Sequence, residues 1–503
     1  MAKKKSGICY LTGAGPGDLG LVTLKARSVI EAAEVIIYDY LCNPEMLAWA
    51  PKGVETIYAG KKAGDHTLTQ EEINALIVKK TAEGKRVVRL KGGDPFIFGR
   101  GGEEAEALAD AGLDFEIIPG ITSAIAAPAY AGIPVTHRDH NAELTLFTGH
   151  EDPTKEEQSI DYARLATRPG TKIMLMGVQR LEPIAARFIE HGADPETPVA
   201  LVRWGTTGRQ QSIRGTLANI AERVRETGFK APAVCVIGDV VTLRDRLNWF
   251  EKKPLFGKRI VVTRTRAQAG ALSRELQALG ADVLELPTIR IEPPEDLLEF
   301  GQLVQDTHTY DWLVFTSPNG VNAYFEMYDK LYKDAREIGG VRIAVVGPAT
   351  AERVRHFRLQ VDLMAEKYVA EGLIDAFEAD SSVENLKILI IRPEQTRDVL
   401  ARELTKRGAI VDQAIAYRTV PEHDSAAAAR FKEQGADLVT FASASAVENF
   451  VALKIPLPPG CKTASIGPVT SRAMRDLGLP VDIEAKTHDI PHLAAAIRTY
   501  YGG

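Results

Sequence analysis

Cysteine is scarce in this chain, and its few cysteines are too far apart to define a cross-linked or metal-bound scaffold. The 503 residues include only Cys9, Cys42, Cys235 and Cys461. None belongs to a Cys-x-x-Cys pair, which argues against both a disulfide framework and a structural zinc site. Cys9 and Cys235 stand inside apolar, strand-like runs, so we expect them in the core. We expect no bound metal.

Long apolar runs and an excess of positive charge are also missing. No run approaches the ~18 apolar residues of a membrane-spanning helix. The basic start MAKKKSG is followed by too few apolar residues before Gly13 for a signal peptide. The formal net charge is −6, which gives no electrostatic basis for binding nucleic acid or a membrane surface. These absences predict a cytoplasmic protein with small-molecule partners, in which an anionic ligand needs a locally basic pocket.

What the chain does contain is a regular alternation of short strand-like runs and longer amphipathic stretches. Runs rich in Val, Ile and Leu recur as EVIIYD, KRVVRLKGGD, FEIIPG, TKIMLMG, PVALVRWG and AVCVIGDVV. This alternation predicts an α/β fold of buried strands followed by helices, with sites at the carboxyl ends of the strands. The length predicts two to four domains. Lys252-Lys253-Pro254 marks the main seam, because a fresh strand begins at Arg259.

The part of the chain after this seam contains a weak internal repeat. Three pairs of segments are similar to each other, namely 311–325 and 437–450, 343–350 and 463–470, and 257–266 and 385–394. Repeated strand-and-helix units of this kind predict two similar α/β lobes that face each other across a cleft.

The segment LTGAGPGDLG follows the first strand-like run and raises the question of a dinucleotide site. Gly13 and Gly15 fit the Gly-x-Gly-x-x-Gly fingerprint, but Asp18 occupies its third position. A carboxylate there would face the pyrophosphate, and Pro16 removes one N–H donor. Asp39 ends the next strand, where a ribose-binding acid would stand, but this support is thin. We expect the loop to serve another ligand.

Two further clusters follow predicted strands. KGGDPFIFGRGGEE (91–104) places two glycine pairs, a proline, an aspartate and an arginine close together, which lets a ligand approach the backbone. PGITSAIAAPAYAGIPVTHRDH (119–140) begins with a turn and a helix start, and it ends in a loop where Arg138 has no core role. A plain glycine turn before a helix is the structural alternative for the first cluster.

Several motifs, taken in order, resemble those of the uroporphyrinogen-III C-methyltransferases, which are tetrapyrrole methylases. They are GAGPGD at 13–18, Tyr38-Asp39, Gly60-Lys61, the 91–104 cluster, PGITSA, GIPVTHR, TGH and Met176-Gly177. The resemblance covers roughly residues 7–250. It implies a two-lobed tetrapyrrole methylase fold, S-adenosylmethionine (SAM) as methyl donor between two α/β domains, and a homodimer through this half. The SAM contacts that it implies are Pro16, Gly92, Gly93, Asp94, Ile97, Thr122, Ser123, Met176 and Gly205.

The same resemblance implies roles for several charged residues. Uroporphyrinogen III carries eight carboxylates, so Arg100 and Arg138 are expected to pair with them. A proton must also leave the macrocycle during methylation. The resemblance offers Asp39 as proton acceptor with Lys61 as donor, and alternatively Glu103 beside Arg100. The sequence leaves both arrangements open.

One position departs from the pattern of this family. In RWGTTGRQ (203–210), Gly208 stands where relatives usually have proline, which predicts a looser loop after Gly205. The SAM assignment does not depend on this position.

After Gly257 we find no nucleophile paired with a base, and hydroxyls and glycines follow the predicted strands instead. The hydroxyl side chains of interest are Thr316, Ser317, Ser443 and Thr470. Beside helix starts, such groups either cap the helix or help backbone N–H groups to bind a carboxylate or phosphate. The sequence does not decide between these two roles.

The ordered set VVTRTR, FTSPNGV, VGPAT, AYRT, FASASAV and IGPVT resembles uroporphyrinogen-III synthase over nearly all of 257–503. This resemblance implies two α/β lobes joined by a two-stranded linker. Lobe one would combine about 257–287 with 420–503, and lobe two would be about 294–414.

The resemblance to the synthase also implies site residues. It points to Tyr417 as the proton donor to the departing hydroxyl of hydroxymethylbilane. The residues that would bind propionates or acetates are Thr316, Ser317, Ser443 and Thr470, with Arg264 and Arg392 as further candidates.

The two resemblances meet at one metabolite, because the product of the synthase is the substrate of the methyltransferase. We therefore predict a bifunctional enzyme, with a methyltransferase at 1–250, a linker at 251–256 and a synthase at 257–503. It would convert hydroxymethylbilane to precorrin-2 for siroheme or cobalamin. Two alternatives are a methylase of a later corrin intermediate and a non-catalytic, tetrapyrrole-binding or regulatory second half.

Overall fold

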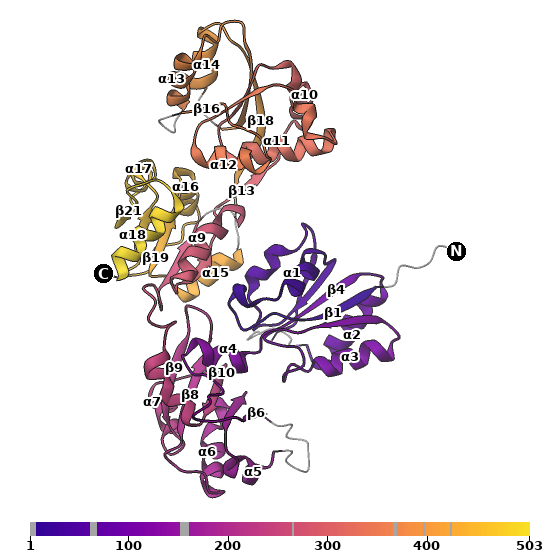
Figure 1. The fold of residues 1–503 in the computed structure, drawn as a ribbon, viewed down its shortest axis with the longest axis vertical. Coiled ribbons are helices and arrows are strands. Elements are labelled where there is room, and N and C mark those ends of the chain that lie inside the picture. Colours follow the sequence, from indigo (N-terminus) through magenta and orange to yellow (C-terminus); the bar gives the residue numbers. More distant parts are fainter. Residues whose placement is uncertain are drawn as a thin grey trace.

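Four sheets, each covered by helices, make up the chain (Figure 1). The computed structural model describes residues 7–60, 68–150, 160–263, 266–365, 370–395, 398–422 and 425–502. The α/β class predicted from the alternation of runs is confirmed. Within the described ranges, no helix has the length and apolar character needed to cross a membrane.

The first domain is built on a fully parallel sheet with the order β3-β2-β4-β1-β5. Its strands are β1 (Ile8–Gly13), β2 (Val35–Tyr38), β3 (Glu55–Tyr58), β4 (Arg86–Lys91) and β5 (Asp114–Ile118). The helices are α1 (Leu24–Glu31), α2 (Gln70–Ala82) and α3 (Gly101–Asp110). α2 and α3 cover one face and α1 the other, so the central strands are buried on both sides and read as continuous apolar runs.

The second domain has a mixed sheet with the order β6-β7-β10-β8-β9, in which only β6 and β7 are parallel. Its strands are β6 (Leu144–Thr148), β7 (Thr171–Leu175), β8 (Pro198–Arg203), β9 (Gln211–Thr216) and β10 (Ala233–Ile237). Its helices are α4 (Ser123–Tyr130), α5 (Tyr162–Thr167), α6 (Leu181–Glu190), α7 (Ile220–Glu226) and α8 (Arg244–Leu247). α4 starts where β5 of the first domain ends and packs its alanines on this second sheet, which joins the two domains.

The second half of the chain forms two lobes. The strands of lobe one are β11 (Arg259–Val262), β12 (Asp282–Glu285), β19 (Leu438–Phe441), β20 (Lys462–Ser465) and β21 (Ile483–Glu484). Its helices are α9 (Arg266–Ala278), α15 (Ser425–Gln434), α16 (Ala444–Ala452), α17 (Pro468–Asp476) and α18 (Ile490–Gly502). Lobe one is therefore assembled from two segments of the chain that are far apart in sequence.

Lobe two lies between these segments in the sequence. Its strands are β14 (Trp312–Phe315), β15 (Arg342–Val345), β16 (Leu363–Met364), β17 (Lys387–Pro393) and β18 (Ile410–Pro421). Its helices are α10 (Leu297–Gln305), α11 (Pro318–Leu331), α12 (Pro348–His356), α13 (Ala370–Asp380) and α14 (Val399–Lys406). β13 (Ile289–Glu292) pairs antiparallel with the end of β18, and this two-stranded ribbon connects the lobes.

The sheets of the two lobes follow the same plan. Lobe one has the order β12-β11-β19-β20-β21, and lobe two has the order β18-β17-β14-β15-β16 after the connecting strand β13. All of these neighbours are parallel. The similar sequence segments fall on equivalent strands, since β14 matches β19, β15 matches β20 and β17 matches β11.

A largely buried carboxylate closes the first half of the chain. Glu251 accepts hydrogen bonds from Ser212 Oγ (2.6 Å), Gln210 Nε2 (2.9 Å) and Asn248 Nδ2 (3.3 Å). It also pairs with the largely buried Arg244. Burial opposes ionisation, but the hydrogen bonds from Ser212, Gln210 and Arg244 outweigh it and lower the pKa of Glu251. The segment that ends this half is thereby tied to β9 and α8.

Replacing Glu251 with alanine should destabilise the first half of the chain by about 2–4 kcal/mol, because Arg244 then remains buried without its partner. Glu182→Ala, which removes a solvent-exposed pair with Arg225, is the control and should cost less than about 1 kcal/mol. Pulse proteolysis in urea at pH 7 measures both. Because the pKa of Glu251 is lower in the folded state, its carboxylate stabilises the fold fully only above the unfolded-state pKa of about 4.3. The difference in unfolding free energy between the wild type and Glu251→Ala should therefore shrink as the pH falls below this value. Equal losses of unfolding free energy in Glu251→Ala and Glu182→Ala would contradict a stabilising role of the Glu251–Arg244 pair.

Candidate active sites

Three glycine loops meet at the carboxyl ends of β1, β4 and β5. Gly15 and Gly93 exchange two backbone hydrogen bonds of 3.1 and 2.8 Å. A Cβ atom on Gly13 would lie 2.5 Å from Cα of Gly120, so these two backbones can approach only because neither residue has a side chain. The loops after the three strands therefore form one continuous surface.

Most of the predicted SAM contacts lie on this surface. Asp94 accepts backbone hydrogen bonds from Gly120 (2.9 Å) and Phe96 (2.8 Å), which fixes the 91–104 loop against the turn before α4. Thr122 caps α4 through the backbone N–H of Ala124. The members at this edge are Pro16, Gly92, Gly93, Asp94, Thr122 and Ser123, while Ile97 is partly exposed on the loop that follows.

The remaining predicted SAM contacts follow strands of the second domain. Met176 comes directly after β7 and is 52% exposed. Gly205 follows β8, and a Cβ there would lie 2.4 Å from Cβ of Ala127 in α4. The next residue, Thr206, accepts a hydrogen bond of 3.1 Å from the backbone N–H of Asp18. The loop after β8 therefore reaches the first glycine loop across the junction of the domains.

The Asp18 side chain has a defined structural role. One of its oxygens accepts a hydrogen bond from Tyr130 Oη (2.8 Å), and the other accepts one from the backbone N–H of Gly20 (2.8 Å). Asp18 thus ties the opening loop to the end of α4. This carboxylate occupies the place where a dinucleotide fingerprint needs its third glycine.

Backbone strain is concentrated in the same loops. Among the described residues, eight that are not glycine have a positive φ. Five of them belong to loops named above, namely Phe98, Arg100, Met176, Trp204 and Thr206. Such conformations cost of order 1–3 kcal/mol each, and they persist only where surrounding contacts enforce them. Their clustering is typical of a functional site.

Asp39 follows β2 and meets two buried cations. Its Oδ1 lies 2.7 Å from Arg89 Nη1, and its Oδ2 lies 3.8 Å from Lys91 Nζ. Both cations also contact Oε1 of Glu104, at 3.0 and 2.8 Å. Arg89, Lys91 and Glu104 are 1%, 3% and 0% exposed, whereas Asp39 remains partly exposed. The cluster presents a single carboxylate toward solvent.

The charges of this cluster balance. Burial alone would lower the pKa of Arg89, but the negative charges of Glu104 and Asp39 outweigh it and raise that pKa. The second oxygen of Glu104, Oε2, is buried without a hydrogen-bond partner among the described residues. Two positive and two negative side chains thus hold one another in place beneath the surface.

The sequence interpretation assigned no site role to Arg89, Lys91 or Glu104, although the last two are the first and last residues of the 91–104 cluster. A signal was present, because Arg89 and Lys91 stand two residues apart in an otherwise apolar strand and therefore share one face of it. Buried charges require partners, so such a pair indicates carboxylates nearby.

Of the other charged residues predicted for this half, Arg100 and Glu103 lie in the 91–104 segment beside this cluster. Arg100 and Glu103 form a bidentate ion pair of 2.8 and 2.6 Å, and both are exposed. Hydrogen bonds from Arg100 lower the pKa of Glu103. Arg138 is exposed in the loop between α4 and β6. Lys61 lies outside the described residues.

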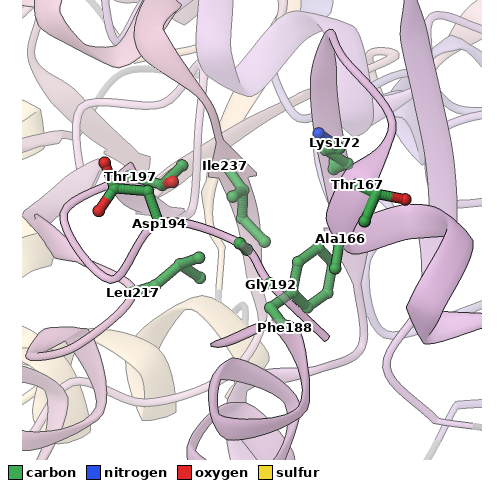
Figure 2. Close-up of a pocket in the computed structure, with 10 residues that line it drawn as sticks. Ala166, Thr167, Lys172, Phe188, Gly192, Asp194, Thr197, Leu217 and Ile237 are labelled. Carbon is green, nitrogen blue, oxygen red and sulfur yellow. The ribbon is translucent and has the colours of Figure 1, made fainter. Parts of the chain in front are cut away.

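A cavity of about 290 Å³ in the second domain is separate from these loops (Figure 2). Its walls include Phe188 of α6, Lys172 near the start of β7, and Ile237 at the end of the antiparallel strand β10. Met176 and Gly205 follow the carboxyl ends of β7 and β8, whereas this cavity lies at the other end of these strands. None of the predicted site residues lines it.

In lobe two, Tyr417 and Ser317 are in direct contact. Their hydroxyl oxygens are 2.9 Å apart, and Ser317 also caps α11 through the backbone N–H of Gly320. Burial raises the pKa of Tyr417, against the opposing effect of hydrogen bonds with Ser317 and Asn319. The neighbouring Thr316 donates its hydroxyl to the carbonyl of Ile391 (3.1 Å).

In lobe one, the predicted hydroxyls also lie at helix starts. Ser443 caps α16 through the backbone N–H of Ala446 (3.1 Å), and Thr470 is buried in the first turn of α17. Figure 1 shows α16 and α17 on the side of lobe one toward lobe two, and α11 and α12 on the side of lobe two toward lobe one. The predicted groups of the two lobes thus lie on facing ends.

The two arginine candidates of the synthase half do not add to this arrangement. Arg392 is engaged by Asp398, by Gln413 Oε1 (2.7 Å) and by the carbonyl oxygens of Pro393 and Glu394 (3.1 Å each). Arg264 lies outside the described residues. Within the ranges that the structure covers, no group of three or more His, Cys, Asp and Glu is placed to hold a metal ion.

Comparison with known proteins gives a family for each half. The family of "Tetrapyrrole (Corrin/Porphyrin) Methylases" matches residues 9–221, and "Uroporphyrinogen-III synthase HemD" matches residues 270–495. A porphyrin biosynthesis protein HemD of Ruminiclostridium josui is 34% identical over 488 residues, which are 96% of each chain. An S-adenosyl-L-methionine-dependent uroporphyrinogen III methyltransferase of Methanosarcina barkeri is 56% identical over 242 residues, 48% of this chain and 95% of that protein.

Among solved structures, a uroporphyrin-III C-methyl transferase of Thermus thermophilus complexed with S-adenyl homocysteine is 37% identical, with a TM-score of 0.41. The match covers 47% of this chain and all of that one. Because the relative from R. josui spans both halves and the relative from M. barkeri spans the first, the family of each half is established. The chain belongs to the uroporphyrinogen-III C-methyltransferases through its first half and to the uroporphyrinogen-III synthases through its second, and it is a bifunctional enzyme of tetrapyrrole biosynthesis.

Proposed function

We propose that residues 257–503 close hydroxymethylbilane to uroporphyrinogen III, and that residues 1–250 methylate this product twice with SAM to give precorrin-2. The observation that carries the proposal is the presence of both families in one chain, since they act on the two sides of one metabolite. Residues 251–256 are proposed as the linker. Precorrin-2 would then feed siroheme or cobalamin synthesis.

The glycine loops fit SAM as the methyl donor. The backbones at Gly93 and Gly120 approach each other without side chains, so a ligand at this edge would meet backbone groups directly. The residues proposed to hold it are Pro16, Gly92, Gly93, Asp94, Ile97, Thr122, Ser123, Met176 and Gly205. SAM brings its own leaving group, so the chain's task is to align the acceptor carbon with the methyl group and to exclude water.

Asp39 is proposed as the acceptor of the proton that leaves the macrocycle. It is the accessible member of the buried cluster, and Arg89 fixes its orientation at 2.7 Å. Lys61 would supply a proton, and Arg100 and Arg138 would bind substrate carboxylates. Glu103 is the alternative base, and its carboxylate is engaged by the bidentate ion pair with Arg100.

Tyr417 is proposed to donate its hydroxyl proton to the departing hydroxyl of hydroxymethylbilane, which leaves as water. Burial keeps the phenol protonated at neutral pH, and Ser317 holds its oxygen at 2.9 Å. The electrophile left behind then closes the ring. The residues proposed to bind propionates or acetates are Thr316, Ser317, Ser443 and Thr470, through the helix starts on which they lie.

The first half is also proposed to form a homodimer. Large apolar side chains are exposed on the loops around its site and on α4, among them Phe96, Ile121 and Ile125. An exposed apolar patch of this kind is typical of a surface that a partner or ligand covers. Light scattering after size-exclusion chromatography would test the assembly.

Product analysis with hydroxymethylbilane, with and without SAM, tests the whole proposal. Without SAM we expect the type III isomer of uroporphyrinogen, and with SAM a product heavier by two methyl groups. Formation of only the type I isomer would reduce the second half to a binding or regulatory module. Supplied uroporphyrinogen III would then test the methyltransferase separately.

Asp39→Asn should lower the methyl-transfer rate by about 100-fold or more, because the amide cannot accept the proton. The affinity for S-adenosylhomocysteine, measured by calorimetry, should change little. Asp114→Asn, at the exposed start of β5, is the matched control and should behave like the wild type. If Glu103→Gln abolished activity while Asp39→Asn retained it, the alternative base would be the correct one.

Tyr417→Phe should slow enzymatic ring closure by about 100-fold and raise the share of the type I isomer, which forms unassisted. Tyr332→Phe removes a hydroxyl that donates to the carbonyl of Gln305 in the same lobe, and it should leave the rate unchanged. Chromatography of the oxidised isomers measures both quantities. An unchanged rate in Tyr417→Phe would remove this residue from the reaction.

A further inference from the structure

The loop between β8 and β9 touches the synthase half directly. A Cβ atom on Gly208 would lie 2.1 Å from the backbone N of Asp282 and 2.3 Å from the carbonyl carbon of Ala281. Asp282 begins β12 of lobe one, and Ala281 precedes it. Only a residue without a side chain lets the two backbones come this close, so Gly208 is a point of contact between the two enzymes.

Arg209 extends this contact toward the methyltransferase site. Its Nε lies 3.6 Å from Asp282 Oδ1, and its guanidinium carbon lies 4.6 Å from the centre of the Trp204 ring. Trp204 makes an edge contact with Tyr40, with ring centres 6.0 Å apart. Because Tyr40 follows Asp39 in the chain, a continuous series of contacts links lobe one to the proposed base.

Lobe one also contacts the first methyltransferase domain. Glu45 lies in the short 3₁₀ helix η2 (Pro44–Trp49), and the side chain of Gln277, near the end of α9, approaches its carboxylate closely enough to lower its pKa. Burial, and then the negative charge of Glu285, raise the pKa of Glu45 to about 7. Glu45 is therefore a partly buried carboxylate that faces lobe one.

The linker holds lobe one against this surface as well. Lys253 Nζ donates to the carbonyl of Ala278 (2.8 Å), and the backbone N–H of Leu255 donates to the carbonyl of Leu279 (3.0 Å). The same short segment of lobe one, residues 277–285, thus meets the first domain, the second domain and the linker. Figure 1 shows α9, which ends in this segment, next to the first domain.

The β8–β9 loop needs such support. Trp204 and Thr206 have φ values of 49° and 72°, which are unfavourable for residues with a Cβ, and most of all for a β-branched one. Asp18 and Gln210 hold Thr206 from within the methyltransferase. Asp282 and Ala281 confine the loop from the synthase side.

We infer that lobe one of the synthase clamps the two methyltransferase domains together and fixes the loops of the SAM cleft. This inference rests on the proposed function, because it takes the cleft to be the SAM site. The fused synthase then has a second role besides ring closure, as a positioning part of the methyltransferase.

Two substitutions in the full-length chain test the clamp from opposite sides. Gly208→Val introduces a side chain where no space exists, and Gln277→Glu places a second carboxylate against Glu45 without touching the β8–β9 loop. Each should enlarge the radius of gyration measured by X-ray scattering. Each should also weaken the binding of S-adenosylhomocysteine about fivefold, a size typical of coupling between sites. Ring-closure activity should stay at the wild-type level.

Gly340→Val and Gln302→Glu are the matched controls, because both residues lie in lobe two away from the contact, and a Cβ on Gly340 would meet nothing within 4 Å. Wild-type size and affinity in both test variants would overturn the clamp. If Gly208→Val weakened binding and Gln277→Glu did not, the loss would reflect local damage to the β8–β9 loop. That outcome would also overturn the clamp. If the wild type binds no S-adenosylhomocysteine, the proposed function fails, and the radius of gyration alone decides whether lobe one docks.

Discussion

The first active site depends on backbones that approach each other without side chains between them. Gly15 and Gly93 pair like neighbouring strands, and Gly13 lies against Gly120, so three loops from one parallel sheet merge into a single surface. A Cβ at Gly120 would lie 2.2 Å from the carbonyl oxygen of Gly93 and would force the loops apart. Parallel sheets place their loops at a common edge, but only glycine lets those loops interlock.

Beneath this surface, a neutral set of four charges sets the position of Asp39. Arg89 and Lys91 are buried on one face of β4, and Glu104 supplies the carboxylate that compensates them from α3. Removing one member of such a buried set typically costs about 3–5 kcal/mol, because the remaining charge loses its partner. The partly exposed Asp39 is thus held in one orientation by Arg89 and Lys91, which suits the proton acceptor that we propose it to be.

The sequence predicted the strands well and their partners poorly. Runs such as EVIIYD and PVALVRWG become β2 and β8, because a strand buried on both faces must be apolar throughout. An apolar run shows that a strand is buried, but it does not show which strand pairs with it or in which direction. The sequence therefore did not predict the antiparallel pairing of β8 with β9. The same limit applied to the site. Glu103 and Glu104 are adjacent in sequence, and only the rotation of α3 decides that Glu104 is buried and Glu103 exposed.

Gly208 shows how fusion changes the meaning of a sequence pattern. Its departure from proline suggested a looser loop, but that loop is held by Asp18, Gln210 and the backbone of lobe one. The three atoms nearest to a Cβ on Gly208 all belong to Ala281 and Asp282, so the contact that calls for glycine is made with the second enzyme. A sequence comparison with methyltransferases that end near residue 250 therefore reveals glycine in place of proline at this position, but it does not reveal the contact that explains the glycine. The residue is constrained by the neighbouring enzyme, and its role becomes visible only when both halves are considered as one structure.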